Sequence, residues 1–263
     1  KCAQGKVLYV NLELDRASCL QRIRTLYESL QIPPANLHNI TLWHLRGQAE
    51  SLDRLAPKLI RRARTAGFRL IIIDPIYKAL TGDENSAHEM AIFTSFLDKI
   101  AHETGASIVF CHHHSKGEQG QKTARDRASG SGVFQRDPDA LLDLIELQLT
   151  DDKRRTIAEK YSAEGIQLGN FWTAWRLEGS IREFPPLQQT RIFFDHPFHF
   201  ADDFELLNDA KAAGERRTES KKQSTNQRLK DAYAFAYARQ NNGAPVGDLA
   251  EFCGVSTATI KQW

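Results

Sequence analysis

The most informative pattern in the chain is a pair of short apolar runs that each end in polar, chargeable residues. Residues 69–75 read RLIIIDP, and residues 107–116 read SIVFCHHHSK. Runs of this length, rich in β-branched residues and separated by a helical stretch, are typical of two buried parallel strands joined by a crossover helix. In open α/β sheets, ligands bind beyond the carboxyl ends of the strands. We therefore expect Asp74 and the histidines to face one nucleotide site.

The same kind of pattern predicts further elements in the first half of the chain. Residues 6–13 form a strand-like run that ends in Glu13. Asp15 and Ser18 suit the start of a helix that continues to about residue 30. The remaining elements expected before residue 107 are a strand at 40–45 and helices at 52–65 and 89–104, whose apolar residues recur at helical spacing.

The second half of the chain has a different pattern. Residues 117–132 are polar and Gly-rich, which predicts a loop. A strand is expected at 140–149, and the period close to two within 154–194 indicates antiparallel strands that extend the sheet. The predicted fold class is α/β, with a mainly parallel sheet flanked by helices and C-terminal antiparallel strands.

A change in composition after residue 200 suggests a domain boundary. We expect the α/β core at 1–200, a charged linker at 201–224 and a small helical segment at 225–263. Within that segment, residues 245–263 have the spacing of a helix-turn-helix or winged-helix-like DNA-binding unit, cut short in its second helix. An ordinary helical hairpin is the alternative.

Charge and composition limit the partners. With 35 Lys and Arg against 33 Asp and Glu, the formal net charge is +2, so any DNA contact must come from a local patch. The basic face of the helix at 52–65 is one such patch, although a solvated helix surface is the simpler explanation. Four scattered cysteines, no signal peptide and no apolar run long enough to cross a membrane predict a soluble, cytoplasmic protein.

Two carboxylates are candidates for chemistry because each follows an apolar strand. Asp74 could hold Mg²⁺ beside nucleotide phosphates, and Glu13 could polarise a water that attacks a phosphate. The alternatives are a backbone-bonded acid at Asp74 and a surface acid at Glu13.

The three histidines at 112–114 and the basic residues that follow are further candidates. Neighbouring side chains on an extended chain point to alternate faces, so at most two of the histidines converge, and no other His or Cys cluster supports zinc. A donor that senses the γ-phosphate is the favoured role for His112 or His113. Lys116 and Arg127 lie in the Gly-rich stretch, where such cations are either solvated or offered to a neighbouring subunit's nucleotide.

The phosphate-binding motif G-x-x-x-x-G-K-[ST] does not occur in the 263 residues. Gly5-Lys6 is not such a loop, because nothing before it completes the motif.

The order of these features resembles a known group of proteins. Strands ending in Glu13 and Asp74 are followed by the His-His-x-x-Lys run at 112–116, by RASGSG at 127–132 and by a hairpin-like stretch at 176–184. This order resembles the RepA-like branch of the RecA-type ATPases, the hexameric replicative helicases and related AAA-type proteins of plasmids, phages and mobile elements. The resemblance covers roughly residues 6–200.

The resemblance implies a RecA-like fold, ATP and Mg²⁺ as cofactors, DNA as a partner and a homo-oligomeric ring, typically a hexamer. Glu13 would be the catalytic carboxylate, and Asp74 would be the Walker B acid that holds Mg²⁺. His112 or His113 would sense the γ-phosphate. Lys116 and Arg127 would contact the neighbouring subunit, with Arg127 as its arginine finger.

The resemblance also implies that the family's first strand and Walker A loop would lie just upstream of Lys1. We therefore expect the chain to be a fragment that binds ATP weakly or not at all by itself, because that loop supplies most phosphate contacts.

Three functions remain open from the sequence. The first is an ATP-dependent DNA helicase or replication ATPase of a mobile element. The second is a DNA-binding replication initiator or regulator with an inactive ATPase-like core. The third is a metal-dependent hydrolase centred on the histidines.

Overall fold

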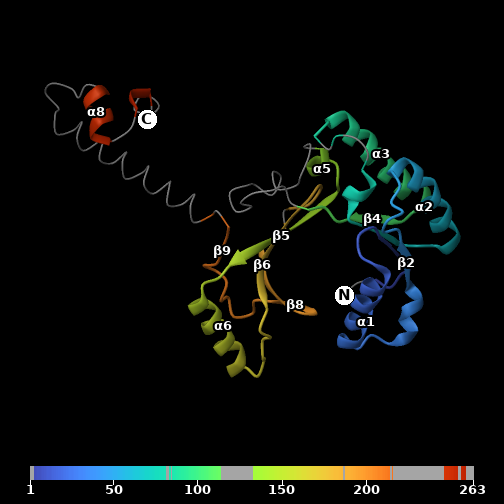
Figure 1. Cartoon of the computed structure of the whole chain (residues 1–263), viewed down its shortest axis with the longest axis horizontal. Helices are drawn as coiled ribbons and strands as arrows, with labels where there is room; N and C mark the ends of the chain where they lie inside the picture. The colour runs from blue at the N-terminus through green and yellow to red at the C-terminus, as the bar shows by residue number, and fades with distance from the viewer. Residues whose placement is uncertain are drawn as a thin grey trace.

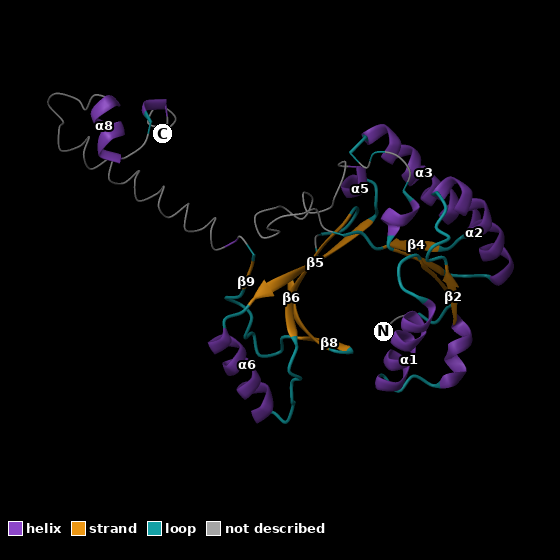
Figure 2. Ribbon diagram, viewed as in Figure 1, coloured by secondary structure: helices purple, strands orange, loops and turns teal. Residues whose placement is uncertain are grey.

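The computed structural model describes residues 3–80, 83, 85–113, 133–185, 187–213, 215, 246–253 and 256–258. These residues form a parallel sheet flanked by helices, followed by an antiparallel sheet (Figures 1 and 2). The predicted α/β class with later antiparallel strands is confirmed.

The parallel sheet has the order β2-β1-β3-β4. Its register pairs Asn11 with Asp74 and Ile73 with Phe110, so β1, β3 and β4 end at nearly the same level. Because all four strands are parallel, their carboxyl ends share one edge of the sheet. The strands are β1 (Val7–Asn11), β2 (Ile40–His44), β3 (Leu70–Asp74) and β4 (Ser107–Phe110).

Three helices flank this sheet: α1 (Arg16–Ser29), α2 (Leu52–Ala66) and α3 (Ala87–Thr104). Figure 2 shows α2 and α3 on one side of the sheet and α1 on the other. Asp15 caps α1 by accepting a hydrogen bond from the Ser18 N–H, as expected from the sequence. The sheet face under α2 and α3 forms the larger core, in which Leu8, Val10 and Ile71 are fully buried.

The strand β4 is less buried than its apolar sequence predicted. Among the described residues it pairs only with β3, and Val109 is 46% exposed. An apolar run reports the average hydrophobicity of a strand, but its place at the edge of a sheet depends on which strands pair with it.

The antiparallel sheet has the order β8-β7-β6-β5-β9. The prediction that these strands extend the parallel sheet is wrong for the described residues, in which no ladder joins β4 to β5. A second, smaller core lies here around Tyr161, Trp172 and Phe193. The strands are β5 (Ala140–Gln148), β6 (Thr173–Ile181), β7 (Thr190–Asp195), β8 (Phe198–Ala201) and β9 (Lys211–Ala212).

The helix α6 (Asp151–Ala163) replaces the strand structure expected from residue 154 onward. Thr150 caps the helix by accepting from the Lys153 N–H, and two aspartates in the first turn favour the positive end of the helix dipole. Ile157 and Tyr161, four residues apart, are its buried residues. Two apolar anchors in a charged stretch were too few to show the helical period in the sequence.

Short elements complete the described chain: η1 (Pro34–Asn39), η2 (Ile76–Ala79), α5 (Val133–Arg136) and α8 (Val246–Cys253). α8 falls where the first helix of the helix-turn-helix is expected, while residues 254–255 and 259–263 lie outside the described residues. In the segment expected to be a linker, Leu207 is fully buried and residues 211–212 form β9. The described part of that segment therefore packs onto the antiparallel sheet.

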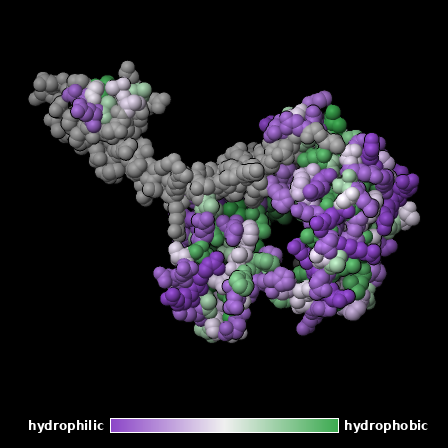
Figure 3. All heavy atoms as spheres, in the orientation of Figure 1, coloured by the Kyte–Doolittle hydropathy of each residue, from purple (hydrophilic) through white to green (hydrophobic). Residues whose placement is uncertain are grey.

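Among the residues that are coloured by hydropathy in Figure 3, hydrophilic ones predominate on the visible face. No described helix has the length and apolar character needed to cross a membrane.

Candidate active site

Polar side chains from three strands gather at the carboxyl edge of the parallel sheet. Asp74 is the last residue of β3, Glu13 follows β1 by two residues, and His112 and His113 follow β4. The parallel pairing of β1, β3 and β4 places these groups at one edge. This is the edge at which open α/β sheets bind ligands.

Backbone hydrogen bonds join the three connections beyond the strands. The Leu12 N–H donates to the Asp74 carbonyl at 2.8 Å. The Ile76 N–H donates to the Cys111 carbonyl at 2.9 Å, and the Cys111 N–H donates to the Ile73 carbonyl at 3.1 Å. The chain positions that carry Glu13, Asp74 and the histidines are therefore held together by the backbone.

The Asp74 carboxylate accepts two hydrogen bonds from protein side chains. The Tyr9 hydroxyl donates to its Oδ2 atom at 2.5 Å, and the Cys111 thiol donates to the same carboxylate. Burial raises the pKa of the Cys111 thiol to about 11, and the Asp74 charge adds to this shift. Burial also raises the pKa of Tyr9, with the Asp74 hydrogen bond as the next cause. Both neighbours therefore stay protonated near neutral pH and serve as donors.

These contacts leave room for a magnesium ion at Asp74. A carboxylate offers about four lone-pair positions, and Tyr9 and Cys111 use two of them. Mg²⁺ prefers oxygen ligands and is often held by one or two carboxylates together with water and substrate phosphates. Among the described residues no group of three or more His, Cys, Asp or Glu side chains could hold a metal. The donor set therefore fits Mg²⁺ held by Asp74, directly or through water, and not a closed protein cage.

Glu13 differs from Asp74 in its surroundings. Its side chain is exposed and makes no hydrogen bond within the described part of the chain. The turn that carries it is closed by Asn11, which accepts hydrogen bonds from the Glu13 and Leu14 N–H groups. A fixed backbone with a free carboxylate is what a group that orients a water molecule requires.

Of the three histidines at 112–114, the structure describes His112 and His113, which lie beside the loop that follows Asp74. The Nδ1 atom of His112 lies 2.7 Å from the His113 carbonyl oxygen. The His113 ring lies 5.6 Å from that of Tyr77, in η2 directly after β3. These contacts couple the connection after β4 to the connection after β3.

Two other predicted site residues, Lys116 and Arg127, lie outside the described residues, as does all of 114–132. Their proposed roles stay predictions.

The basic face of α2 is partly used within the molecule. Lys58 lies 2.5 Å from a Glu50 oxygen, and the Arg62 guanidinium lies over the Trp43 ring at 5.3 Å. These contacts favour the simpler interpretation of this face as a helix surface.

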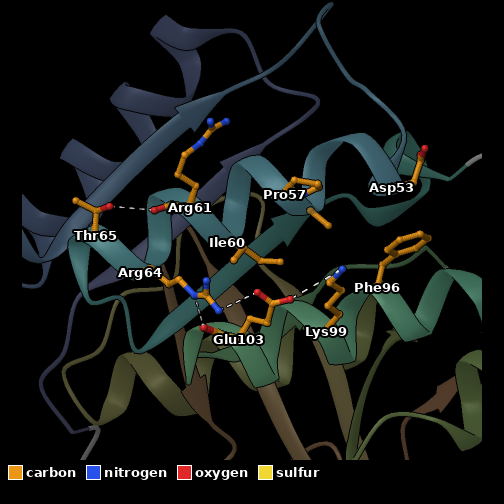
Figure 4. Close-up of a pocket in the computed structure, with 10 residues that line it drawn as sticks. Asp53, Pro57, Ile60, Arg61, Arg64, Thr65, Phe96, Lys99 and Glu103 are labelled. Atoms are coloured by element: carbon orange, nitrogen blue, oxygen red, sulfur yellow. Dashed lines mark hydrogen bonds and ion pairs between the residues drawn. The ribbon is translucent and has the colours of Figure 1, made fainter.

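A surface pocket of about 560 Å³ lies between α2 and α3 (Figure 4). Arg64 bonds both the Glu103 carboxylate and its carbonyl there, each at 2.9 Å. None of its lining residues comes from a strand end, so it is separate from the site at the sheet edge. The lining residues are Asp53, Ala56, Pro57, Ile60, Arg61, Arg64, Thr65, Phe96, Lys99 and Glu103.

Three residues at the site were not predicted from the sequence: Tyr9, Asn11 and Cys111. Asn11 is a polar residue between Val10 and Leu12 in an apolar run, and this interruption was a usable signal. Tyr9 offered none, because an aromatic residue in a strand is ordinary.

Comparisons with known proteins were made at the level of sequence and of structure. Residues 1–119 match the model of the AAA domain family. One solved structure, described as an ATPase domain, is 14% identical, with 72% of this chain and 70% of that chain covered and a TM-score of 0.43. A structure of a DnaB-like replicative helicase with its primase interactions is 15% identical, with 72% and 48% covered and a TM-score of 0.46. This chain thus spans about half of that helicase. No curated protein matches the sequence.

The family match covers β1 to β4 and therefore all three strand ends that form the site. The match is to the AAA domain family and ends shortly after the histidines that follow β4.

Proposed function

We propose that this chain is a subunit of an ATP-dependent DNA helicase or replication ATPase of a mobile genetic element. The observation that supports this most directly is the single sheet edge that carries Glu13, Asp74 and His113, tied together by backbone hydrogen bonds. Phosphoryl transfer depends mainly on positioning and charge stabilisation, which such an edge can supply.

The two carboxylates have different proposed roles. Asp74, fixed by Tyr9 and Cys111, helps to hold Mg²⁺, which would neutralise charge on the phosphates. Glu13, exposed on a fixed turn, orients the attacking water and accepts its proton.

The remaining predicted residues couple the site to its surroundings. His112 or His113 would detect the γ-phosphate, and the contact between His113 and Tyr77 gives this signal a path to the loop after Asp74. Lys116 and Arg127 would reach the nucleotide of the neighbouring copy in a ring, with Arg127 as the finger that stabilises charge in the transition state. We propose a hexameric ring on DNA.

Turnover requires a phosphate-binding loop, and the motif for one is not present in the 263 residues. Hydrolysis is therefore to be tested with a chain in which such a loop is joined to residues 1–263. The segment at 225–263, which the sequence predicts to be helical, is proposed as an added DNA-binding unit.

The test is DNA-stimulated ATP hydrolysis by a chain that contains the phosphate-binding loop. Glu13→Gln should reduce kcat by at least about 100-fold while nucleotide binding changes little, because the amide cannot accept the proton of the attacking water. Glu28→Gln, which makes the same change at an exposed position near the end of α1, is the matched control. Full turnover in the Glu13 variant would contradict the proposed site.

The helix-turn-helix spacing of residues 245–263 favours one second candidate, a DNA-binding initiator or regulator with an inactive ATPase-like core. DNA binding measured against salt concentration separates the two. If residues 245–263 account for all DNA binding and the loop-containing chain has no ATPase activity, the second function is correct.

A further inference from the structure

Asn11, the last residue of β1, is a buried polar residue beside the proposed catalytic carboxylate. It is only 1% exposed, and its neighbours along the strand, Val10 and Leu12, are apolar. Burying an amide group without hydrogen bonds is costly. The hydrogen bonds of the Asn11 amide therefore indicate why a polar side chain is buried at this position.

The amide makes four polar contacts, three of them to the turn that follows it. Its Oδ1 accepts from the Glu13 N–H at 3.2 Å and from the Leu14 N–H at 2.9 Å. Its Nδ2 donates to the Leu14 carbonyl at 2.7 Å and lies 3.2 Å from Nδ1 of His44. Donation by Nδ2 to both atoms makes Nδ1 of His44 the acceptor of the second bond. The full hydrogen-bonding capacity of the amide is then used.

These contacts set the backbone around Glu13. Two further bonds anchor the same segment to its neighbouring strands: Leu12 N–H to the Asp74 carbonyl, and Leu45 N–H to the Asn11 carbonyl, both 2.8 Å. The Glu13 side chain itself has no hydrogen bond among the described residues. Its direction therefore depends on its backbone, and its backbone depends on Asn11.

We propose that Asn11 is the positioning residue for Glu13, with His44 as its anchor on β2. This inference rests on the proposed function, because it assumes that Glu13 acts on a water molecule. Asn11 does not touch the reacting atoms. It acts by holding the turn of residues 11–14 in the one arrangement that aims the carboxylate.

The test compares Asn11→Ala and Asn11→Asp in the loop-containing chain. Asn11→Ala should lower kcat by about 10- to 100-fold, because a small displacement of a catalytic group has effects of this size. The KM for ATP should change by less than about 2-fold, since Glu13 does not bind the ground state. Asn11→Asp keeps acceptors for the two N–H groups and should recover part of the lost kcat.

A control is needed because a buried substitution also destabilises the protein. Ile100→Val, in the core face of α3 and outside the turn, removes a buried methylene. If Ile100→Val lowers kcat as much as Asn11→Ala, the effect is one of stability and the positioning role is wrong. Unchanged kcat in Asn11→Ala would also overturn it.

Amide hydrogen exchange separates this inference from the proposed function. The Glu13 and Leu14 amides lose their acceptor in Asn11→Ala and should exchange at least about 10-fold faster than in the parent chain. Unchanged exchange would show that Asn11 does not hold the turn. If exchange accelerates but the parent chain has no ATPase activity, Asn11 holds the turn but the proposed function is wrong. Asn11 would then have no role in catalysis.

Discussion

The Tyr9 hydroxyl donates a hydrogen bond to the Asp74 carboxylate at 2.5 Å, although 65 residues separate the two in the chain. They meet because β1 and β3 are parallel neighbours in which Tyr9 pairs with Ile72, two residues before Asp74. A tyrosine side chain is long enough to lean along the strand to the carboxylate. This contact links the two strands that carry the candidate carboxylates.

Removing this hydroxyl should weaken the site and the fold together. Tyr9→Phe should lower the free energy of unfolding by about 1 kcal/mol, because a hydrogen bond to a half-buried carboxylate is lost. It should also raise the Mg²⁺ concentration needed for half-maximal activity of the loop-containing chain, because Asp74 is then less fixed. Urea unfolding and Mg²⁺ titration measure these effects. Tyr27→Phe, which removes a hydroxyl from α1, should change neither.

The Cys111 thiol should react slowly because its pKa is raised. Its pKa is raised from 9.0 to about 11, chiefly by burial and secondly by Asp74. At pH 8 its thiolate fraction is then about 100-fold below that of an unshifted thiol. Alkylation followed by mass spectrometry on the Cys111 peptide should show rates that rise up to about pH 11. Asp74→Asn should speed labelling at pH 8 only in part, because burial remains; no acceleration would contradict the contribution of Asp74.

The raised pKa of Cys111 also makes the stability of the protein depend on pH. The folded state favours the neutral thiol, so the contribution of Cys111 to stability is fully present below about pH 9 and is lost as the pH rises towards about 11. Cys111→Ser should therefore reduce the loss of stability between pH 9 and 11. An identical pH dependence in both proteins would be inconsistent with the raised pKa.

The two positions Ile71 and Val109 should respond very differently to truncation. Ile71, in β3, is fully buried under α2 and α3, whereas Val109, in β4, is 46% exposed. Ile71→Ala should cost about 3 kcal/mol of unfolding free energy because it leaves a cavity. Val109→Ala should cost less than about 1 kcal/mol. Equal losses in urea unfolding would show that the β4 edge is covered in solution.

The Arg176 guanidinium in β6 ties Glu215 to the antiparallel sheet. It lies 2.6 Å from Glu215 and 2.8 Å from Glu178, and its side chain is only 9% exposed. Arg176→Ala leaves two poorly solvated carboxylates and should lower the unfolding free energy by about 3 kcal/mol.

The matched control is Arg155→Ala, which removes an exposed pair at 3.9 Å to Asp152 and should change stability by less than about 0.5 kcal/mol. Thermal or urea unfolding of both variants measures the two changes in unfolding free energy. A small effect of Arg176→Ala would mean that Glu215 is solvated.

Local patterns predicted most of the first sheet. The runs that became β1, β3 and β4, and the helical periods of α2 and α3, are visible within a few residues of sequence because burial imposes a fixed spacing on each element. The helical period of α6 could not be recognised in the sequence, because Ile157 and Tyr161 are its only described buried residues.

The sequence by itself determined which residues end the strands, and so it identified Glu13, Asp74 and the histidines as candidates. Only the tertiary structure showed that Tyr9 and Cys111 hold Asp74, that Asn11 holds the turn of Glu13, and that β4 lies at an edge of the described sheet. The reason is physical. The spacing of apolar residues reflects the local geometry of a single helix or strand, so it can be recognised in a short stretch of sequence. A hydrogen bond between side chains on different strands depends on strand pairing, which brings together residues that are far apart in the sequence.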